Sequence, residues 1–231
     1  MNKEIPVYSG TLRSHSLNVP AIIHNASGII VFGKRIKSLV FSTDVSIIKN
    51  INTDAVLAVY PFTPQASISE AIIAVSDVPV FAGVGGGLTS GQRSVRMAAE
   101  VEMQGGFGIV VNAPMAPVTI AKIKKIVELP VVTTIVSKYQ NYDDQIRAGA
   151  DILNVSAAEK TAELVKILRD KYPSIPIIAT GGPTDESIAE TIAAGANAIT
   201  YTPPANGELF RQKMKSYRSS LGQKRQTETC L

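Results

Sequence analysis

Residues 78–87 read VPVFAGVGGG, and residues 175–182 read IPIIATGG. Each stretch opens with a hydrophobic residue and a proline, continues as an apolar run, and ends in glycines ahead of a helical pattern. Continuous apolar runs without polar alternation are typical of strands covered on both faces, as in a parallel sheet flanked by helices. The two stretches therefore predict two buried parallel strands, each followed by a tight turn into a helix.

Six more apolar runs of this kind lie along the chain, at residues 36–43, 55–62, 107–114, 129–137, 151–157 and 197–203. Helical patterns separate them at residues 44–52, 67–77, 90–105, 116–128, 141–149, 159–173 and 185–195. Eight strands with helical connections over about 190 residues predict an α/β fold, a single (β/α)₈ barrel. An open doubly wound sheet is the alternative. The hydrophobic-proline pair recurs at 78–79, 129–130 and 175–176, and such internal repetition favours the barrel.

The segments outside the strands divide the chain into three parts. We expect an N-terminal extension (1–35) that packs on the barrel, the barrel itself (36–221) and a flexible polar tail (222–231). Near the end of the barrel part, four apolar residues follow helical spacing: Phe210, Met214, Tyr217 and Leu221. This spacing predicts an amphipathic helix whose apolar side docks on the body of the protein.

Composition indicates one folded domain, because 45% of the 231 residues are hydrophobic and only 18% are charged. The formal net charge of +4 lies near the C-terminus: residues 211–231 hold six basic and one acidic residue, whereas residues 1–210 hold 17 and 18. A near-neutral body gives no basic patch for a nucleic-acid partner. No apolar run is long enough to span a membrane. We therefore expect neither a nucleic acid nor a membrane as a partner.

The cysteine and histidine content points to a reduced, cytoplasmic protein without a metal site. The single cysteine, Cys230, lies one residue from the end, and the two histidines have no partner at a metal-ligand spacing.

Polar and glycine residues at the ends of the predicted strands are the candidate site residues, because the active sites of (β/α)₈ barrels lie at the C-terminal ends of the strands. Gly85, Gly86 and Gly87 form one glycine cluster, and Gly181 and Gly182 form the other. Glycine lets backbone N–H groups approach a phosphate closely, and the following helix adds its dipole. The alternative is that these glycines only form tight turns.

These two glycine motifs, each followed by a helix, resemble the phosphate-binding (β/α)₈ barrels, which include the histidine-biosynthesis isomerase and cyclase barrels, the sugar-phosphate epimerases and thiazole synthase. The resemblance implies phosphate sites in opposite halves of the barrel. This sequence departs from the pattern of those barrels in two places. Pro203 and Pro204 follow the last strand, where backbone N–H donors are expected. Asp44 matches one member of the expected catalytic aspartate pair, but the other position holds Lys138.

Asp44 and Lys138 are the candidate catalytic residues. They lie 94 positions apart, about half a barrel, and would face each other across its mouth. Asp44 would act as the general base and Lys138 as the acid or electrostatic partner. The alternatives are that Asp44 caps the next helix and that Lys138 is a solvated loop cation.

Four further polar residues at strand ends are candidate substrate ligands: Asn112, Asn154, Tyr60 and Tyr201. The amides suit substrate hydroxyl groups, although they can equally bond a neighbouring loop. The tyrosines can contact a ligand, or they can pack in the core.

The sequence thus predicts an isomerase, epimerase or lyase that acts on a small phosphorylated metabolite by proton transfer. A non-catalytic sensor barrel, similar to the glycerol-3-phosphate-responsive antiterminators, is the alternative, and a barrel that binds flavin mononucleotide (FMN) is a third. No other cofactor is expected, and a homo-oligomer is possible.

Overall fold

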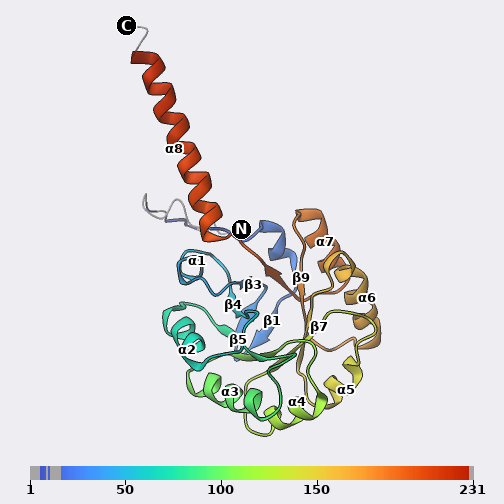
Figure 1. The fold of residues 1–231 in the computed structure, drawn as a ribbon. Helices are drawn as coiled ribbons and strands as arrows, with labels where there is room; N and C mark the ends of the chain where they lie inside the picture. The colour runs from blue at the N-terminus through green and yellow to red at the C-terminus, as the bar shows by residue number, and fades with distance from the viewer. Residues whose placement is uncertain (1–5, 9, 11–16, 229–231) are drawn as a thin grey trace.

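The computed structural model describes residues 6–8, 10 and 17–228. Eight parallel strands in this part of the chain close into one barrel in the order β10-β3-β4-β5-β6-β7-β8-β9 (Figure 1). They are β3 (Ser38–Phe41), β4 (Ala55–Ala58), β5 (Val80–Gly85), β6 (Gly108–Val111), β7 (Val131–Ile135), β8 (Ile152–Val155), β9 (Ile177–Thr180) and β10 (Ala198–Tyr201). Because β10 pairs in parallel with both β9 and β3, the sheet is closed. The predicted (β/α)₈ barrel is confirmed, and the open sheet is excluded.

Helices surround the barrel and cover the outer faces of its strands (Figure 1). They are α1 (Val45–Lys49), α2 (Ala66–Val75), α3 (Gln92–Met103), α4 (Pro117–Lys124), α5 (Tyr142–Arg147), α6 (Thr161–Lys171) and α7 (Asp185–Ala193), with a 3₁₀ turn, η3 (Ala158–Lys160), before α6. In α6, for example, Leu164 and Leu168 are buried against outward-facing residues of β8 and β9. Burial on both faces of each strand explains why the strands read as continuous apolar runs.

The repeated proline before three strands has a structural reason. The carbonyl oxygen of each proline accepts a backbone hydrogen bond from the preceding strand: Pro79 from Val56 (2.8 Å), Pro130 from Ile109 (2.9 Å) and Pro176 from Leu153 (3.0 Å). Each proline therefore extends the sheet with its acceptor, and its missing N–H falls at a strand start, where proline is tolerated.

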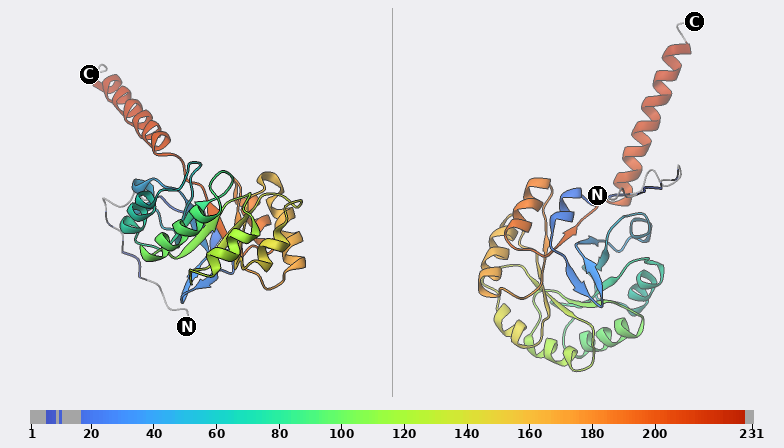
Figure 2. Two further views of the ribbon diagram at one scale, coloured as in Figure 1. Left: turned by 60° about the horizontal axis from the view of Figure 1, so that its bottom comes forward. Right: turned by 180° about the vertical axis from the view of Figure 1, so that it is seen from behind.

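Side chains that point into the barrel form a single apolar cluster in the half of the barrel where the strands begin. Every strand contributes to this cluster, and Phe81 of β5 is its largest fully buried member. An antiparallel hairpin, β1 (Ile29–Val31) and β2 (Lys34–Ile36), adds buried residues to the same cluster. The hairpin lies at the end of the barrel where the strands begin, as the left view of Figure 2 shows. A short 3₁₀ helix, η2 (Ala21–Asn25), precedes it.

The last helix, α8 (Asn206–Glu228), departs from the prediction for this segment. It projects away from the barrel (Figures 1 and 2). The side chains of Phe210, Met214 and Tyr217 are 67%, 43% and 56% exposed. For these three residues the predicted docking on the body is wrong. Basic residues border the stripe, and their burial against the body would cost desolvation energy.

The ends of the chain extend beyond what the structure describes. The helix continues past Gly222, the position at which a polar tail is predicted to start. The side chain of Leu221, residues 229–231 with Cys230, and residues 1–5, 9 and 11–16 of the N-terminal extension lie outside the described part. Among the helices that are described, none combines the length and apolar character needed to cross a membrane.

Candidate functional site

A layer of neutral polar side chains lies above the apolar interior of the barrel. Side chains alternate between the two faces of a strand, so the residue two positions after an interior residue also points inward. Val110, Val132, Ile152, Ile178 and Ala198 belong to the interior cluster. The inward positions nearest the C-terminal ends of β6 to β10 are therefore Asn112, Thr134, Asn154, Thr180 and Thr200. Five neighbouring strands thus present amides and hydroxyls, but no charge, to the mouth of the barrel.

Hydrogen bonds link three of these side chains into a chain. Asn154 Nδ2 donates to Thr134 Oγ1 (3.2 Å), and Thr134 Oγ1 donates to Asn112 Oδ1 (3.4 Å). Within the described residues, the Oδ1 atom of Asn154 and the Oγ1 atom of Thr200 are buried without a hydrogen-bond partner. Buried polar atoms nearly always have a partner, so a water molecule or a ligand group is expected to supply one here.

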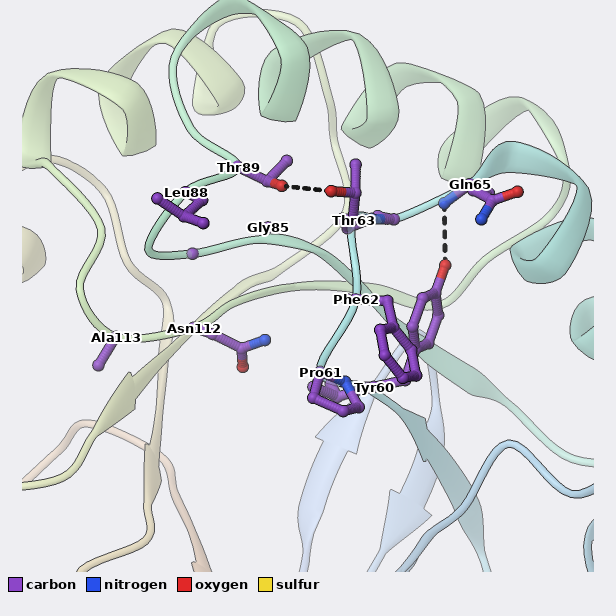
Figure 3. Close-up of a pocket in the computed structure, with 14 residues that line it drawn as sticks. Tyr60, Pro61, Phe62, Thr63, Gln65, Gly85, Leu88, Thr89, Asn112 and Ala113 are labelled. Carbon is purple, nitrogen blue, oxygen red and sulfur yellow. Dashed lines mark hydrogen bonds between the residues drawn. The ribbon is translucent and has the colours of Figure 1, made fainter.

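A cavity of about 670 Å³ opens beside this layer, between the loops that follow β4 and β5 (Figure 3). Asn112 points into it from the end of β6, and Tyr60 faces it from the other side. The hydroxyl oxygen of Tyr60 accepts a hydrogen bond from the backbone N–H of Gln65 (2.9 Å). The hydroxyls of Thr63 and Thr89 lie 3.5 Å apart at the rim. Tyr60 is the only ionisable residue among those that line the cavity.

The cavity brings together part of the first predicted glycine cluster with two predicted substrate ligands. Gly85 and Gly86 line it together with Tyr60 and Asn112, whereas Gly87 does not. The backbone N–H of Gly86 donates to the carbonyl of Thr89 (2.8 Å), and that of Gly87 donates to the carbonyl of Pro114 (2.9 Å). These two N–H groups are therefore engaged by backbone carbonyls, one in the same loop and one in the loop after β6, and are not available to bind an anion.

The second glycine cluster lies elsewhere, in a cavity of about 430 Å³ near α6 and α7. Two carboxylates, Glu159 and Glu190, line this cavity with Gly181 and Gly182. A Cβ atom on Gly181 would lie within 2.8 Å of side chains of α7 and β10, so close packing requires this glycine. Packing therefore explains Gly181 without a bound phosphate, and the two carboxylates would repel an anion in this cavity.

The other two predicted ligands differ in their surroundings. Asn154 is 7% exposed and belongs to the polar layer. Tyr201 is half-buried and packs against the outer core cluster formed with α6 and α7. Pro203 is buried next to it, and Pro203 and Pro204 supply no N–H donors after β10.

Asp44 is the N-cap of α1. Its carboxylate accepts hydrogen bonds from the backbone N–H groups of Ser46 (2.8 Å) and Ile47 (3.2 Å) and from the Ser46 hydroxyl (2.6 Å). The Ser46 hydroxyl is the main reason why the pKa of Asp44 lies below its ordinary value, and partial burial opposes this effect. A carboxylate held in this way is a weaker proton acceptor than a free one.

Lys138 follows β7, opposite β3 in the barrel order. It lines a separate cavity of about 150 Å³ beside α6. Its Nζ lies 3.7 Å from Glu163 Oε1 and 5.6 Å from the centre of the Tyr139 ring. The structure therefore places Asp44 and Lys138 in different surroundings, and no described cavity contains both.

The site residues predicted from the sequence did not include several that the structure places at the site: Thr134, Thr180 and Thr200 of the polar layer, and Thr63, Thr89 and Phe62 of the cavity rim. The three layer threonines share a signal. Each lies two positions after an apolar residue that points into the barrel, as Asn112 and Asn154 do. The rim residues have no such signal, because they lie on loops.

The described residues contain no group of three or more histidine, cysteine, aspartate or glutamate side chains that could hold a metal ion. The inward strand-end positions of β6 to β10 hold amides and hydroxyls rather than carboxylates. Magnesium sites in proteins usually include at least one carboxylate, so this donor set does not fit that ion.

Comparisons with known proteins identify the fold. No family model matches the chain, and no curated protein matches it in sequence. A phosphonopyruvate hydrolase solved as a complex with oxalate and Mg²⁺ is 12% identical, with a TM-score of 0.61 over 85% of this chain and 84% of that one. The phosphoenolpyruvate phosphomutase of Streptomyces platensis subsp. rosaceus is 14% identical, with a TM-score of 0.59 over 88% and 84%.

A dihydrodipicolinate synthase of Bacillus anthracis is also similar, at 15% identity and a TM-score of 0.57 over 82% of this chain and 78% of that one. At these identities the likeness shows the fold alone. The chain is a (β/α)₈ barrel, and its site has to be interpreted from its own residues.

Proposed function

We propose that this protein is an enzyme that acts on a small phosphorylated or carboxylic metabolite at the C-terminal mouth of its barrel. The observation that carries the proposal is the cavity of about 670 Å³ between the β4 and β5 loops, which adjoins the polar layer. Active sites of (β/α)₈ barrels lie at this end. The similar solved structures named above are those of enzymes, which also supports a catalytic role.

The lining of the cavity indicates how it would hold such a metabolite. Thr63, Thr89 and Asn112 offer neutral hydrogen-bond donors to phosphate or carboxylate oxygens. The loop that carries Thr89 leads into α3, whose N-cap residue, Gly91, contributes no side-chain cap. The helix dipole therefore favours negative charge near this loop. Apolar rim residues such as Phe62 would cover the remainder of the ligand.

Proton transfer in this cavity is assigned to Tyr60 rather than to Asp44 and Lys138. The Tyr60 oxygen accepts the Gln65 N–H, so its own proton is free to point towards a ligand. A phenol in this position can act as a proton donor. Asp44 instead caps α1, and Lys138 lines another cavity. The position of Lys138 in that other cavity does not support the acid or electrostatic role predicted for it.

The second candidate function is a non-catalytic sensor of the same metabolite. It is favoured by one observation, the absence of any charged side chain among the residues that line the cavity. The FMN alternative has no comparable support, because Pro203 and Pro204 remove two N–H groups that a cofactor phosphate would need after β10.

A thermal-shift screen tests the binding site. The panel consists of triose and pentose phosphates, small phosphorylated or phosphonylated acids, and matched compounds without phosphorus. A ligand present at about 100 times its dissociation constant stabilises the protein by about 2.7 kcal/mol, or roughly 5–10 °C for a chain of this size. Asn112→Leu should abolish the shift. A shift that survives in Asn112→Leu would place the ligand elsewhere and refute the proposed site.

Turnover of the binding compounds, followed by NMR, separates the enzyme from the sensor. Tyr60→Phe should retain the thermal shift and lose turnover. Tyr139→Phe is the matched control, since Tyr139 is an exposed tyrosine on the loop beside the Lys138 cavity. Binding without conversion in the wild type would support the sensor, and unchanged turnover in Tyr60→Phe would overturn the role given to Tyr60.

A further inference from the structure

The exposed side of α8 carries a stripe formed by Phe210, Met214 and Tyr217. Steps of four and three residues place these side chains on one face of the helix, over two turns. All three are more than two-fifths exposed. Single exposed apolar residues are common on protein surfaces, but an aligned row on a projecting helix indicates a contact surface.

Basic residues border this stripe on both sides. With 3.6 residues per turn, Lys213 falls along one edge, and Arg211 and Arg218 fall along the other. Residues 206–220 contain four basic residues, with Lys215 as the fourth, and one acidic residue, Glu208, so the net charge of this part is +3. All of these side chains are exposed. The surface is therefore apolar in its centre and cationic along its borders.

This charge pattern opposes the pairing of two copies of the chain through the stripe. When two helices pack along such a row, the residues that flank the row face each other across the interface. Lys213, Arg211 and Arg218 would meet basic residues of the second copy in either orientation. Residues 209–220 contain no aspartate or glutamate that could offset this repulsion. An anionic partner is favoured instead.

The far side of the helix completes the pattern. Gln212, Ser216 and Ser219 lie opposite the stripe, where they are exposed, polar and uncharged. Basic residues beside an apolar row, with a polar side opposite that row, are typical of helices that lie in the plane of a membrane surface. There the apolar side chains enter the boundary between headgroups and acyl chains, and lysine and arginine reach the lipid phosphates.

We propose that α8 attaches this protein to the surface of membranes that contain anionic lipids, without crossing them. The helix projects from the body (Figures 1 and 2). Gln212 and Ser216, opposite the stripe, line a cavity with Ser46 of the body, so the stripe faces away from the barrel and can lie flat on a surface. Because α8 begins five residues after β10, at the mouth end of the barrel, attachment would bring the cavity near the membrane. This proposal is independent of the function assigned to the cavity.

Vesicle sedimentation with the whole 231-residue chain tests the proposal. The two vesicle types are phosphatidylcholine alone and phosphatidylcholine mixed with phosphatidylserine, at low ionic strength. The partition constant calculated from the bound fraction should be about tenfold higher on the anionic vesicles. Added salt should lower this partition constant. A triple variant, Phe210→Ser, Met214→Ser and Tyr217→Ser, should lose most of this binding. Circular dichroism and the melting temperature check that each variant is folded.

A matched pair of charge variants tests the orientation of the helix. Lys213→Gln and Lys215→Gln change the net charge equally, but Lys213 borders the stripe and Lys215 lies farther round the helix. Lys213→Gln should weaken vesicle binding more. For the wild-type protein, equal binding to the neutral and the anionic vesicles would overturn the proposal. Absence of binding to either vesicle type would overturn it as well.

Two further outcomes would identify a different partner. Analytical ultracentrifugation that shows a dimer lost in the triple variant would assign the stripe to a second copy. Binding to duplex DNA that equals vesicle binding and survives the triple variant would assign the charge to nucleic acid. Either result would overturn the membrane proposal.

Discussion

Replacing Asp44 with alanine separates the two roles that sequence and structure give to this carboxylate. Its three hydrogen bonds to Ser46 and Ile47 hold the first turn of α1. Loss of such a cap costs about 1 kcal/mol. For a chain of this size that lowers the melting temperature by roughly 2–4 °C. Asp44→Asn keeps an acceptor oxygen and should cost less than about 0.5 kcal/mol.

The contribution of Asp44 also depends on pH. In the folded protein the pKa of the Asp44 carboxyl group lies below its ordinary value of 3.8. The hydrogen bond from the Ser46 hydroxyl is the largest cause, and the backbone N–H groups of Ser46 and Ile47 add to it. A carboxyl group whose pKa is lower in the folded state stabilises the fold above the unfolded-state pKa, and this stability is lost as the pH falls through the folded-state pKa. The stability difference between wild type and Asp44→Asn should therefore be constant near neutrality and change only below about pH 4.

Urea denaturation followed by circular dichroism, at neutral and acidic pH, measures both effects. The thermal shifts produced by the metabolite panel are recorded for the same variants. A capping role leaves those shifts and any turnover unchanged in Asp44→Ala once the lower baseline stability is subtracted. If Asp44→Ala kept its full stability and lost turnover, the capping argument would fail and Asp44 would again be the general base.

Two further predictions concern packing around the barrel. Gly181→Ala would place a Cβ 2.7 Å from Ile188 and 2.8 Å from Ile199, and this overpacking should cost about 1–3 kcal/mol in urea denaturation. Gly207→Ala is the control, since nothing lies within 4 Å of its new Cβ; equal losses in the two variants would contradict the packing argument. Phe81→Ala should lower the free energy of unfolding by about 3–5 kcal/mol, because Phe81 is the largest fully buried side chain of the barrel interior, and a loss below about 1 kcal/mol would show that the interior collapses around the gap.

The architecture was predictable because burial on both faces leaves a simple trace in the sequence. Apolar runs marked every strand of the barrel, and the hydrophobic-proline pairs marked strand starts whose proline carbonyls extend the sheet. The exception is α8. Periodicity shows that Phe210, Met214 and Tyr217 share a face, but it does not show what that face contacts.

The site was predictable only where the regular alternation of a strand reaches it. Asn112 and Asn154 lie in step with interior residues, so their inward direction follows from the pattern. Threonine favours strands in its own right, so Thr134 within a strand is not by itself a signal of a site. Beyond the last strand residue the alternation ends, and the direction of Lys138 depends on loop contacts. Asp44 carried the same sequence signal for a helix cap as for a base at a strand end.

The hairpin at the lower end of the barrel limits how a ligand can move. β1 and β2 bury Ile29, Val31 and Ile36 in the interior cluster, and Phe32 meets the ring of Phe107 edge to face, with centroids 5.3 Å apart. A ligand that reaches the polar layer can therefore enter and leave only at the mouth. In the enzyme proposed above, substrate and product would bind in the same cavity and use the same opening, so accumulated product is expected to compete with substrate.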